Sequence, residues 1–317
     1  FWAFMYEVPG KCKHVNEAEL AYINQDEAAE AAAKPAAKPN TKPAAKATGM
    51  YDYVVENGGE WVDFHDASVV ACPEGRVVKQ FNFAKQFSEA DIVVSISKLK
   101  SHQLMSYTGA MKNLFGLMIG LEKAQSHYRF PNKKDFGGFL TDLVVAAKPS
   151  YAIMDAIVGM EGPGGPGGGD PIKLGFLAAS DNILALDWKC ASLVGYNPHH
   201  IVNLEDALQR GIWLNSESEI TTVGASEKEC ENLSFKIVKD PSETLGKMVP
   251  KVVDIIANAF FVKTPRFNVT KCKSCQRCKQ ICPAQIISMD GKNGTAKLMD
   301  KKKCLHCFCC HEICPFD

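Results

Sequence analysis

The chain has 317 residues, of which 46% are hydrophobic, and this length and composition predict a protein with two folded domains. The most apolar stretches, residues 113–121 and 252–262, are too short to cross a bilayer, which excludes a membrane-inserted protein. The net charge is zero, but residues 263–317 carry 11 basic and 4 acidic residues, whereas the rest of the chain carries 25 and 32. The basic residues lie around cysteine loops without interleaved aromatic side chains, so the pattern argues against nucleic-acid binding.

Residues 1–48 are predicted to form a poorly structured segment. Residues 1–26 show no usable hydrophobic period, and residues 27–47 are a tract of Ala, Lys, Pro and Glu. Such a tract lacks the apolar side chains of a core and is typical of a semi-extended linker. The first residue is Phe1 rather than methionine, so we expect that the natural chain does not start here.

Residues 49–240 predict an α/β domain with a partly parallel sheet. The apolar runs at residues 90–96, 151–158 and 174–179 are typical of strands that are buried on both faces. We also expect strands at residues 61–64, 77–83 and 220–223, and helices at residues 50–57, 139–146, 182–194 and 204–210.

Basic side chains gather directly after the strand predicted at residues 90–96. Lys98, Lys100, His102 and Lys112 bring three fixed positive charges and one imidazole within fifteen residues. Open α/β sheets place their ligands beyond the carboxyl ends of their strands. We therefore expect a loop that holds a small anionic substrate, with His102 as acid or base. A solvated basic loop is the alternative.

Carboxylates and a second imidazole extend this candidate site. Asp155 lies near the end of the strand predicted at residues 151–158, and Glu161 follows it, so both are plausible ligands of a metal or general bases. His127 could meet His102, although a structural histidine among aromatic side chains is the alternative. The candidate catalytic residues are Lys98, Lys100, His102, Lys112 and Asp155.

Two further stretches have open roles. Residues 162–170 contain six glycines in their first eight residues, but they lack a Walker or GxGxxG pattern. A flexible lid or connector and a phosphate cradle are the alternatives for this stretch. Asp181 is placed to cap the helix predicted at residues 182–194, whereas Asp187 is an unusual residue for the interior of that helix.

Four of these motifs together carry a family resemblance. They are K-x-K-x-H at residues 98–102, TGAxKNxFG at residues 108–116, the glycine-rich stretch, and AASDNILALD at residues 178–187. In this order they resemble the family called domain of unknown function 362, from Ala47 to Val238. The resemblance implies a carboxy-terminal ferredoxin domain but no particular reaction. Family members usually open with a further α/β portion, so we expect a fragment whose sheet has an unprotected edge.

The last 46 residues contain one cysteine pattern twice. Each copy has the spacing C-x2-C-x2-C-x3-C followed by proline, and the copies are offset by 32 residues. In this bacterial pattern for 4Fe-4S clusters, the fourth cysteine of each run binds the cluster of the other run. We therefore predict two 4Fe-4S clusters. The first has the ligands Cys272, Cys275, Cys278 and Cys314, and the second has the ligands Cys304, Cys307, Cys310 and Cys282.

Other uses of these cysteines fit less well. Zinc sites normally have two CxxC pairs that are separated by a longer loop, and a disulfide framework would need a secreted protein. Five cysteines are left over, an odd number that is typical of a reducing cytoplasm. Cys309 lies between two predicted ligands, where it fills the loop or substitutes for a ligand.

Residues 264–317 resemble the bacterial two-cluster ferredoxin domain. Residues 286–289 and 296–299, with the turn between them, predict a short hairpin, and the fold expected is a small α+β domain. Such domains usually continue into a closing strand, whereas this chain stops at Asp317. Residues 241–263 are predicted to be a helical tether between the two domains.

The sequence therefore predicts a cytoplasmic iron–sulfur redox protein that transfers single electrons. In one hypothesis the α/β domain is an oxidoreductase that uses electrons from the clusters. In another the chain is a non-catalytic carrier or interaction subunit that docks a partner oxidoreductase. The clusters could also be purely structural. The basic carboxy-terminal domain would suit an acidic partner such as another ferredoxin.

Overall fold

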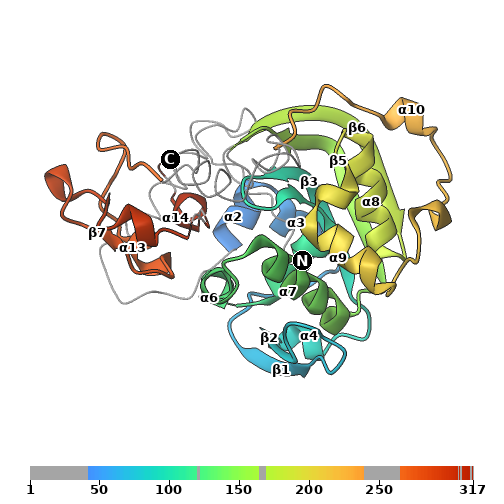
Figure 1. Ribbon diagram of the computed structural model, residues 1–317, viewed down its shortest axis with the longest axis horizontal. Helices are drawn as coiled ribbons and strands as arrows, with labels where there is room; N and C mark the ends of the chain where they lie inside the picture. The colour runs from blue at the N-terminus through green and yellow to red at the C-terminus, as the bar shows by residue number, and fades with distance from the viewer. Residues whose placement is uncertain are drawn as a thin grey trace, which may run out of the picture.

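The computed structural model describes residues 42–119, 122–163, 169–238, 265–305, 307, 309–314 and 316. Within these residues the strands form a four-stranded sheet and two small antiparallel pairs (Figure 1). The strands are β1 (Ala67–Ala71), β2 (Gln80–Ala84), β3 (Val94–His102), β4 (Ser106–Thr108), β5 (Tyr151–Glu161), β6 (Asp170–Ser180), β7 (Ile287–Ser288) and β8 (Lys297–Leu298).

The four-stranded sheet has the order β4-β3-β5-β6. β3 and β5 are parallel, and the two outer pairs are antiparallel. A parallel pair needs a crossover connection, and here the helices between β4 and β5 carry the chain back. This mixed sheet confirms the prediction of an α/β fold with partly parallel pairing.

The helices surround this sheet unevenly. Figure 1 shows α8 alongside β5 and β6, with α7 and α9 close to each other. The α-helices are α2 (Lys42–Ala47), α3 (Met50–Glu56), α4 (Lys85–Ser88), α5 (Ala110–Asn113), α6 (Glu122–Arg129), α7 (Lys133–Ala147), α8 (Ile183–Leu193), α9 (Val202–Arg210), α10 (Glu227–Cys230), α13 (Arg277–Ile281) and α14 (Cys309–Glu312). Within the described residues, no helix is long and apolar enough to span a membrane.

Helix α7 provides much of the main core. Its amino end is capped by Asn132, whose side chain accepts a hydrogen bond from the Lys134 amide. Its carboxyl end turns at Lys148, which has a left-handed φ of 43°. All residues from Phe136 to Ala147 are buried, so the helix packs on most of its circumference.

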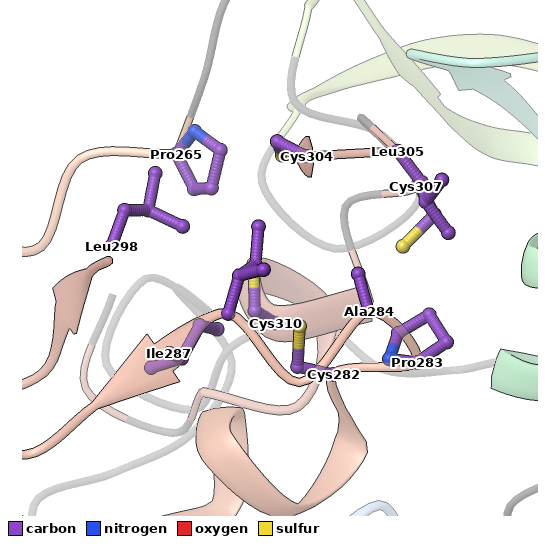
Figure 2. A pocket seen from close by; sticks show the side chains of 11 residues that line it. Pro265, Cys282, Pro283, Ala284, Ile287, Leu298, Cys304, Leu305, Cys307 and Cys310 are labelled. Carbon is purple, nitrogen blue, oxygen red and sulfur yellow. The ribbon is translucent and has the colours of Figure 1, made fainter. Parts of the chain in front are cut away.

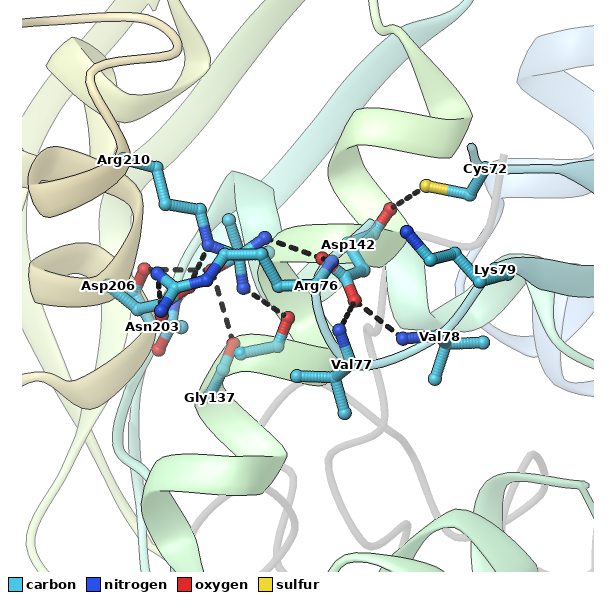
Figure 3. Close-up of polar contacts among 12 residues, drawn as sticks. Cys72, Arg76, Val77, Val78, Lys79, Gly137, Asp142, Asn203, Asp206 and Arg210 are labelled. Atoms are coloured by element: carbon cyan, nitrogen blue, oxygen red, sulfur yellow. Dashed lines mark hydrogen bonds and ion pairs between the residues drawn. The ribbon is translucent and has the colours of Figure 1, made fainter. Parts of the chain in front are cut away.

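A buried carboxylate joins α7 to two distant segments (Figure 3). Asp142 is fully buried and accepts hydrogen bonds from the amides of Arg76, Val77 and Val78 at 2.8, 2.6 and 2.7 Å. It also forms an ion pair with Arg210 of α9. Because its charge meets one cation and three amide donors, Asp142 stabilises the packing of the 76–78 segment and α9 against α7.

A second buried carboxylate connects α8 to α5. Asp187 accepts hydrogen bonds from the amides of Ala110 and Met111 at 2.6 and 2.9 Å, so it caps a helix from outside that helix. A Cβ atom at Gly109 would lie 2.2 Å from the Asp187 Oδ1 atom. The TGA motif and the last residue of AASDNILALD therefore form one structural contact.

The structure corrects several predicted strands. β3 begins at Val94, because the amides of Glu89 and Ala90 still donate to the turn after α4, and it continues through His102. β6 is an edge strand with alternating exposure rather than a strand buried on both faces. Residues 61–64 and 220–223 form no strand, because neither run has a pairing partner among the described residues.

Other predicted elements agree with the structure. Helix α3 matches the helix predicted at residues 50–57 to within one residue, and α8 matches the one predicted at residues 182–194 to within one residue at each end. Helices α7 and α9 contain the other two predicted helices. The strand predicted at residues 77–83 begins later, as β2. Asn182 rather than Asp181 caps α8, because the Asn182 side chain accepts from the Ala185 amide.

The carboxy-terminal module, residues 265–316, has a small core of its own. Cys278, Ile287 and Ala296 are buried there, and β7 pairs with β8 as the predicted hairpin. The predicted tether at residues 241–263 lies outside the described residues, as do residues 1–41 of the segment predicted to be poorly structured. Within the rest of that segment, residues 42–47 form the helix α2.

Candidate functional site

The cysteines of the carboxy-terminal module lie in tightly coiled loops and on two short helices. Ser274 and Gln276 have φ values of 56° and 65°, so the backbone turns sharply between the first three cysteines. Helix α13 carries Cys278 and ends at Cys282, and α14 carries Cys310. Local spacing and left-handed residues thus direct several sulfur atoms toward a common interior.

Electrostatic interactions join thiols of the two cysteine runs in two overlapping groups. Burial, followed by the charges of Cys275, Cys314 and Cys272, raises the pKa of the Cys278 thiol to about 11. Burial likewise raises the pKa of Cys310, and its neighbouring thiols are Cys307, Cys304, Cys282 and Cys278. Each group includes the fourth cysteine of the other run, and Cys278 belongs to both.

One of these groups lines an apolar pocket (Figure 2). Cys282, Cys304, Cys307 and Cys310 all border it, together with the apolar side chains of Pro265, Pro283, Ala284, Ile286, Ile287, Leu298 and Leu305. Thiolates that are crowded in an apolar space repel one another unless cations lie between them. This set of donors fits an iron–sulfur cluster, whose iron atoms supply that positive charge.

Two observations bear on the other uses of these cysteines. Among the described residues, no group of three or more His, Cys, Asp or Glu side chains is placed to hold a single metal ion. Cys309 is buried but does not border the pocket, and its sulfur contacts the Cys307 carbonyl oxygen at 4.0 Å.

The basic residues predicted to follow a strand lie within one. Lys98, Lys100 and His102 all belong to β3, because this strand begins later and runs further than predicted. Lys98 pairs with Asp155 of β5 at 2.8 Å and also donates to the Val158 carbonyl at 2.9 Å. The expectation of a loop is therefore wrong, and Lys98 and Asp155 neutralise each other on one face of the sheet.

The other candidate residues have partners that differ from those of Lys98 and Asp155. Lys100 is buried opposite Thr108 in the β3–β4 pairing. Glu161 accepts from the Lys236 amide and pairs with the Lys236 ammonium, both at 2.9 Å, so it fixes the end of β5. Asp155 and Glu161 thus have separate partners. Residues 164–168 of the glycine-rich stretch lie outside the described residues.

A cluster of basic side chains surrounds His102. Its pKa is well below the usual value because of burial, and Lys112, His127 and Lys133 lower it further. Burial, followed by the charge of Lys112, lowers the pKa of His127 to about 3. The charges of Lys112, His127 and Lys133 therefore all act on the buried imidazole of His102. We call these four residues the basic cluster.

Sequence patterns pointed to only part of the basic cluster. His127 could be suspected as a second imidazole, but nothing in the sequence linked it to Lys112. Lys133 lies at the start of α7, where a lysine is normally read as a solvated residue. The sequence signal for a role of His127 was the presence of the aromatic residues Phe115 and Phe136, which pack against its ring in the structure.

Comparisons with known proteins match two parts of the chain. Residues 17–192 match the family model "Domain of unknown function (DUF362)", and residues 264–315 match "4Fe-4S dicluster domain". The chain is 36% identical over 140 residues to "Thylakoid-associated protein sll1697" of Synechocystis sp.. That alignment covers 44% of this chain and 43% of the relative, so the chain spans less than half of that protein. No solved structure matches the chain.

The first of these matches covers more than half of the 317 residues. The second supports an iron–sulfur, electron-transfer role for the carboxy-terminal module. The chain belongs to the family named domain of unknown function 362 and carries a 4Fe-4S dicluster domain.

Proposed function

We propose that the carboxy-terminal module holds two 4Fe-4S clusters and relays single electrons through them. The observation that carries this proposal is the pocket that Cys282 lines together with Cys304, Cys307 and Cys310, because it joins the fourth cysteine of one run to three cysteines of the other. The first cluster has the ligands Cys272, Cys275, Cys278 and Cys314, and the second has Cys304, Cys307, Cys310 and Cys282. This arrangement holds the two clusters within one small core.

The apolar pocket supports the redox role of the second cluster. Burial and hydrogen bonds to the sulfur atoms set the potential of such clusters within a range of about −700 to +450 mV. The pocket wall contains side chains such as Pro265, Ile287 and Leu298, which exclude water from the cluster. When bound, the cluster supplies one-electron transfer, and the protein supplies the thiolates and the low-dielectric surroundings.

The α/β domain is proposed as the place where these electrons are used, which would make the chain an oxidoreductase. The buried imidazoles of His102 and His127 support this proposal, because they provide groups that can donate or accept a proton within the domain. The second candidate is an electron carrier that docks an acidic partner such as a ferredoxin. It is favoured by the excess of basic residues in residues 263–317. A reducing, cytoplasmic location is part of this proposal, because five of the thirteen cysteines are left over once eight are assigned to the clusters.

Anaerobic reconstitution tests the number of clusters. We expect about eight irons per chain and, after reduction with dithionite, the electron paramagnetic resonance signal of two interacting clusters. Cys282→Ser should leave about four irons, whereas Cys309→Ser is the matched control and should keep about eight. Four irons in the unchanged protein, or bound zinc with no iron, would contradict the proposal.

Combined substitutions test the crossed ligand sets. We start from a variant in which Cys304, Cys307 and Cys310 are serine, which should keep only the first cluster. Adding Cys314→Ser should remove that cluster, whereas adding Cys282→Ser should not. The reverse result would mean that each run binds its own cluster.

A further inference from the structure

Three consecutive lysines form a short 3-10 helix in the carboxy-terminal module. This helix, η5, is Lys301–Lys303, and it lies directly before Cys304 in the chain. All three lysines are exposed, and none of their side chains has an ion pair or a hydrogen bond within the described part of the chain. Three such charges in so short a stretch create a strong local positive potential.

Hydrogen bonds hold this helix beside a predicted cluster ligand. The Asp300 side chain caps η5 and accepts from the Lys302 amide at 2.9 Å. The Cys304 amide donates to the Lys301 carbonyl at 3.3 Å, so the helix leads directly into this cysteine. Cys304 lines the apolar pocket together with the other ligands predicted for the second cluster. The helix of lysines therefore adjoins the second cluster.

An exposed apolar side chain lies next to these charges in the chain. Met299 is 61% exposed, although its amide donates to the Ile286 carbonyl at 2.8 Å, which anchors its backbone to the module. Its neighbour Leu298 lines the pocket with Cys304 (Figure 2). Methionine is common on surfaces that bind other proteins, because its flexible side chain adapts to the partner.

We propose that Met299 and Lys301–Lys303 form the docking surface for an acidic redox protein, which exchanges one electron with the second cluster. Electron transfer slows steeply with distance, so a partner must approach close to a cluster, and this surface adjoins one. Redox partners meet in small, transient interfaces in which complementary charge sets the rate of association. Carboxylates of the partner meet the lysines, and an apolar side chain of the partner meets Met299.

This inference rests on the proposed electron relay and deepens it. It names the cluster at which electrons enter or leave and the chemistry of the partner. In the transfer itself the reduced cluster loses one electron and the acceptor gains it, and no bond or proton is transferred. The lysines of the first cysteine run, Lys271, Lys273 and Lys279, do not form such a block, because they alternate with the ligands.

A nucleic acid fits this surface less well than an acidic protein does. Three adjacent lysines neutralise few phosphates, and residues 297–303 contain no aromatic side chain on which a base could stack. The proposal therefore commits to a protein partner that carries carboxylates.

The first test measures electron transfer from the full chain to two forms of one acceptor. The chain is loaded with clusters, reduced, freed of reductant and mixed with native cytochrome c, which is basic, or with succinylated cytochrome c, whose lysines have become carboxylates. The haem absorbance reports the transfer. We expect the succinylated form to be reduced at least about tenfold faster at low ionic strength, with the advantage lost as salt screens the charges.

The second test measures contact rather than transfer. Carbodiimide treatment of a mixture of the oxidised chain and succinylated cytochrome c joins lysines to carboxylates that touch them. Mass spectrometry should find the cross-links at Lys301–Lys303. Lysines of the first cysteine run should remain unlinked.

Substitutions locate the docking surface. The triple change Lys301→Gln, Lys302→Gln and Lys303→Gln should slow the reduction of succinylated cytochrome c at least about fivefold at 0.1 M salt, where charges act over roughly 10 Å. Arginine at all three positions keeps the charge and should keep the rate. The matched control, Lys271→Gln with Lys273→Gln and Lys279→Gln, removes the same charge beside the first run, and it should slow the transfer less than about twofold.

Some results would overturn this inference and leave the relay intact. A chain with about eight irons that reduces both forms of cytochrome c at equal rates would be one such result. Equal slowing by the two triple variants would be another, because it would place no partner at η5. Salt-resistant binding of a single-stranded oligonucleotide that the η5 variant loses would assign the surface to nucleic acid instead. A chain without iron, or one that reduces neither form, would refute the relay itself and this inference with it.

Discussion

The two cores of this chain are held together by different means. The α/β domain has a large apolar core, and its buried carboxylates Asp142 and Asp187 are satisfied by groups of the protein itself. The carboxy-terminal module has a small core of Cys278, Ile287 and Ala296, with other cysteines partly buried against it. Small domains with so little core usually depend on a metal or a disulfide. We therefore expect that one region folds by packing, whereas the other depends on a bound cofactor.

Removing iron should produce the largest difference in stability between the carboxy-terminal module and the α/β domain. An iron chelator applied under anaerobic conditions should unfold the module, because cluster binding provides much of its folding free energy. Hydrogen exchange of amides in β7 and β8 should then approach that of an unfolded chain, whereas amides in β3 and β5 stay protected. The α/β domain in the same sample is the control. Equal protection of β7 before and after chelation would show that the module folds without clusters.

Asp142→Asn should have the largest effect of any single substitution on the α/β domain. It removes the ion pair with Arg210 and places an amide donor against the backbone amides of residues 76–78. Breaking a buried pair in this way costs about 3–5 kcal/mol. Urea unfolding followed by circular dichroism measures the loss, and Asp135→Asn, an exposed change in the same helix, should cost far less. Iron content should not change.

Asp187 should make the stability of the α/β domain depend on pH. Burial raises its pKa from 3.8 to about 7, although hydrogen bonds from Met111 and Ala110 oppose the shift. The stabilising contribution of the protonated group is therefore complete below about pH 4 and is lost as the pH rises through about 7. Asp187→Asn cannot ionise, so the free energy of unfolding of the unchanged protein should fall relative to this variant between pH 5 and 8.

The comparison with Asp187→Asn is necessary because other groups act in the opposite direction. His102 and His127 have pKa values below that of an unfolded chain, so their contribution grows as the pH rises. Both proteins contain these histidines, and the difference between them isolates Asp187. An unchanged difference across this pH range would mean that Asp187 does not titrate there.

Lys98→Met should have the smallest effect. Its ion pair with Asp155 is partly exposed, with side-chain exposures of 20% and 32%, so solvent screens much of the attraction. We expect a loss of less than about 1 kcal/mol in the free energy of unfolding, measured by urea unfolding, with no change in iron content. A loss of several kcal/mol would show that solvent does not screen this ion pair.

How far the sequence predicted these features depends on how local they are. The cysteine ligands follow from spacing alone, because a loop around a cluster is made from neighbouring residues. The start of β3 was misplaced, because Ile92 precedes the strand in spite of its β-branched side chain and is 68% exposed. An exposed side chain outside the sheet pairing gains little from its strand propensity.

The basic cluster also shows that sequence patterns miss interactions between distant residues. Lys133 and His102 are far apart in the sequence, yet the charge of Lys133 lowers the pKa of His102 in the folded chain. Asp187 could be marked as unusual within its helix, but its partners in α5 are 76 and 77 residues away. Spacing patterns do not contain such contacts, whereas the helices that create them were largely predictable from hydrophobic period.

The parallel pairing of β3 with β5 also has a consequence for the order of folding. Lys98 and Asp155 are 57 residues apart, so this pairing must close a long loop. β5 and β6 are consecutive along the chain and form an antiparallel pair, so they can associate over a much shorter loop. Short-range contacts generally form sooner than long-range ones. We expect the β5–β6 pair to form early, and β3 to join the sheet only after α7 has packed against it.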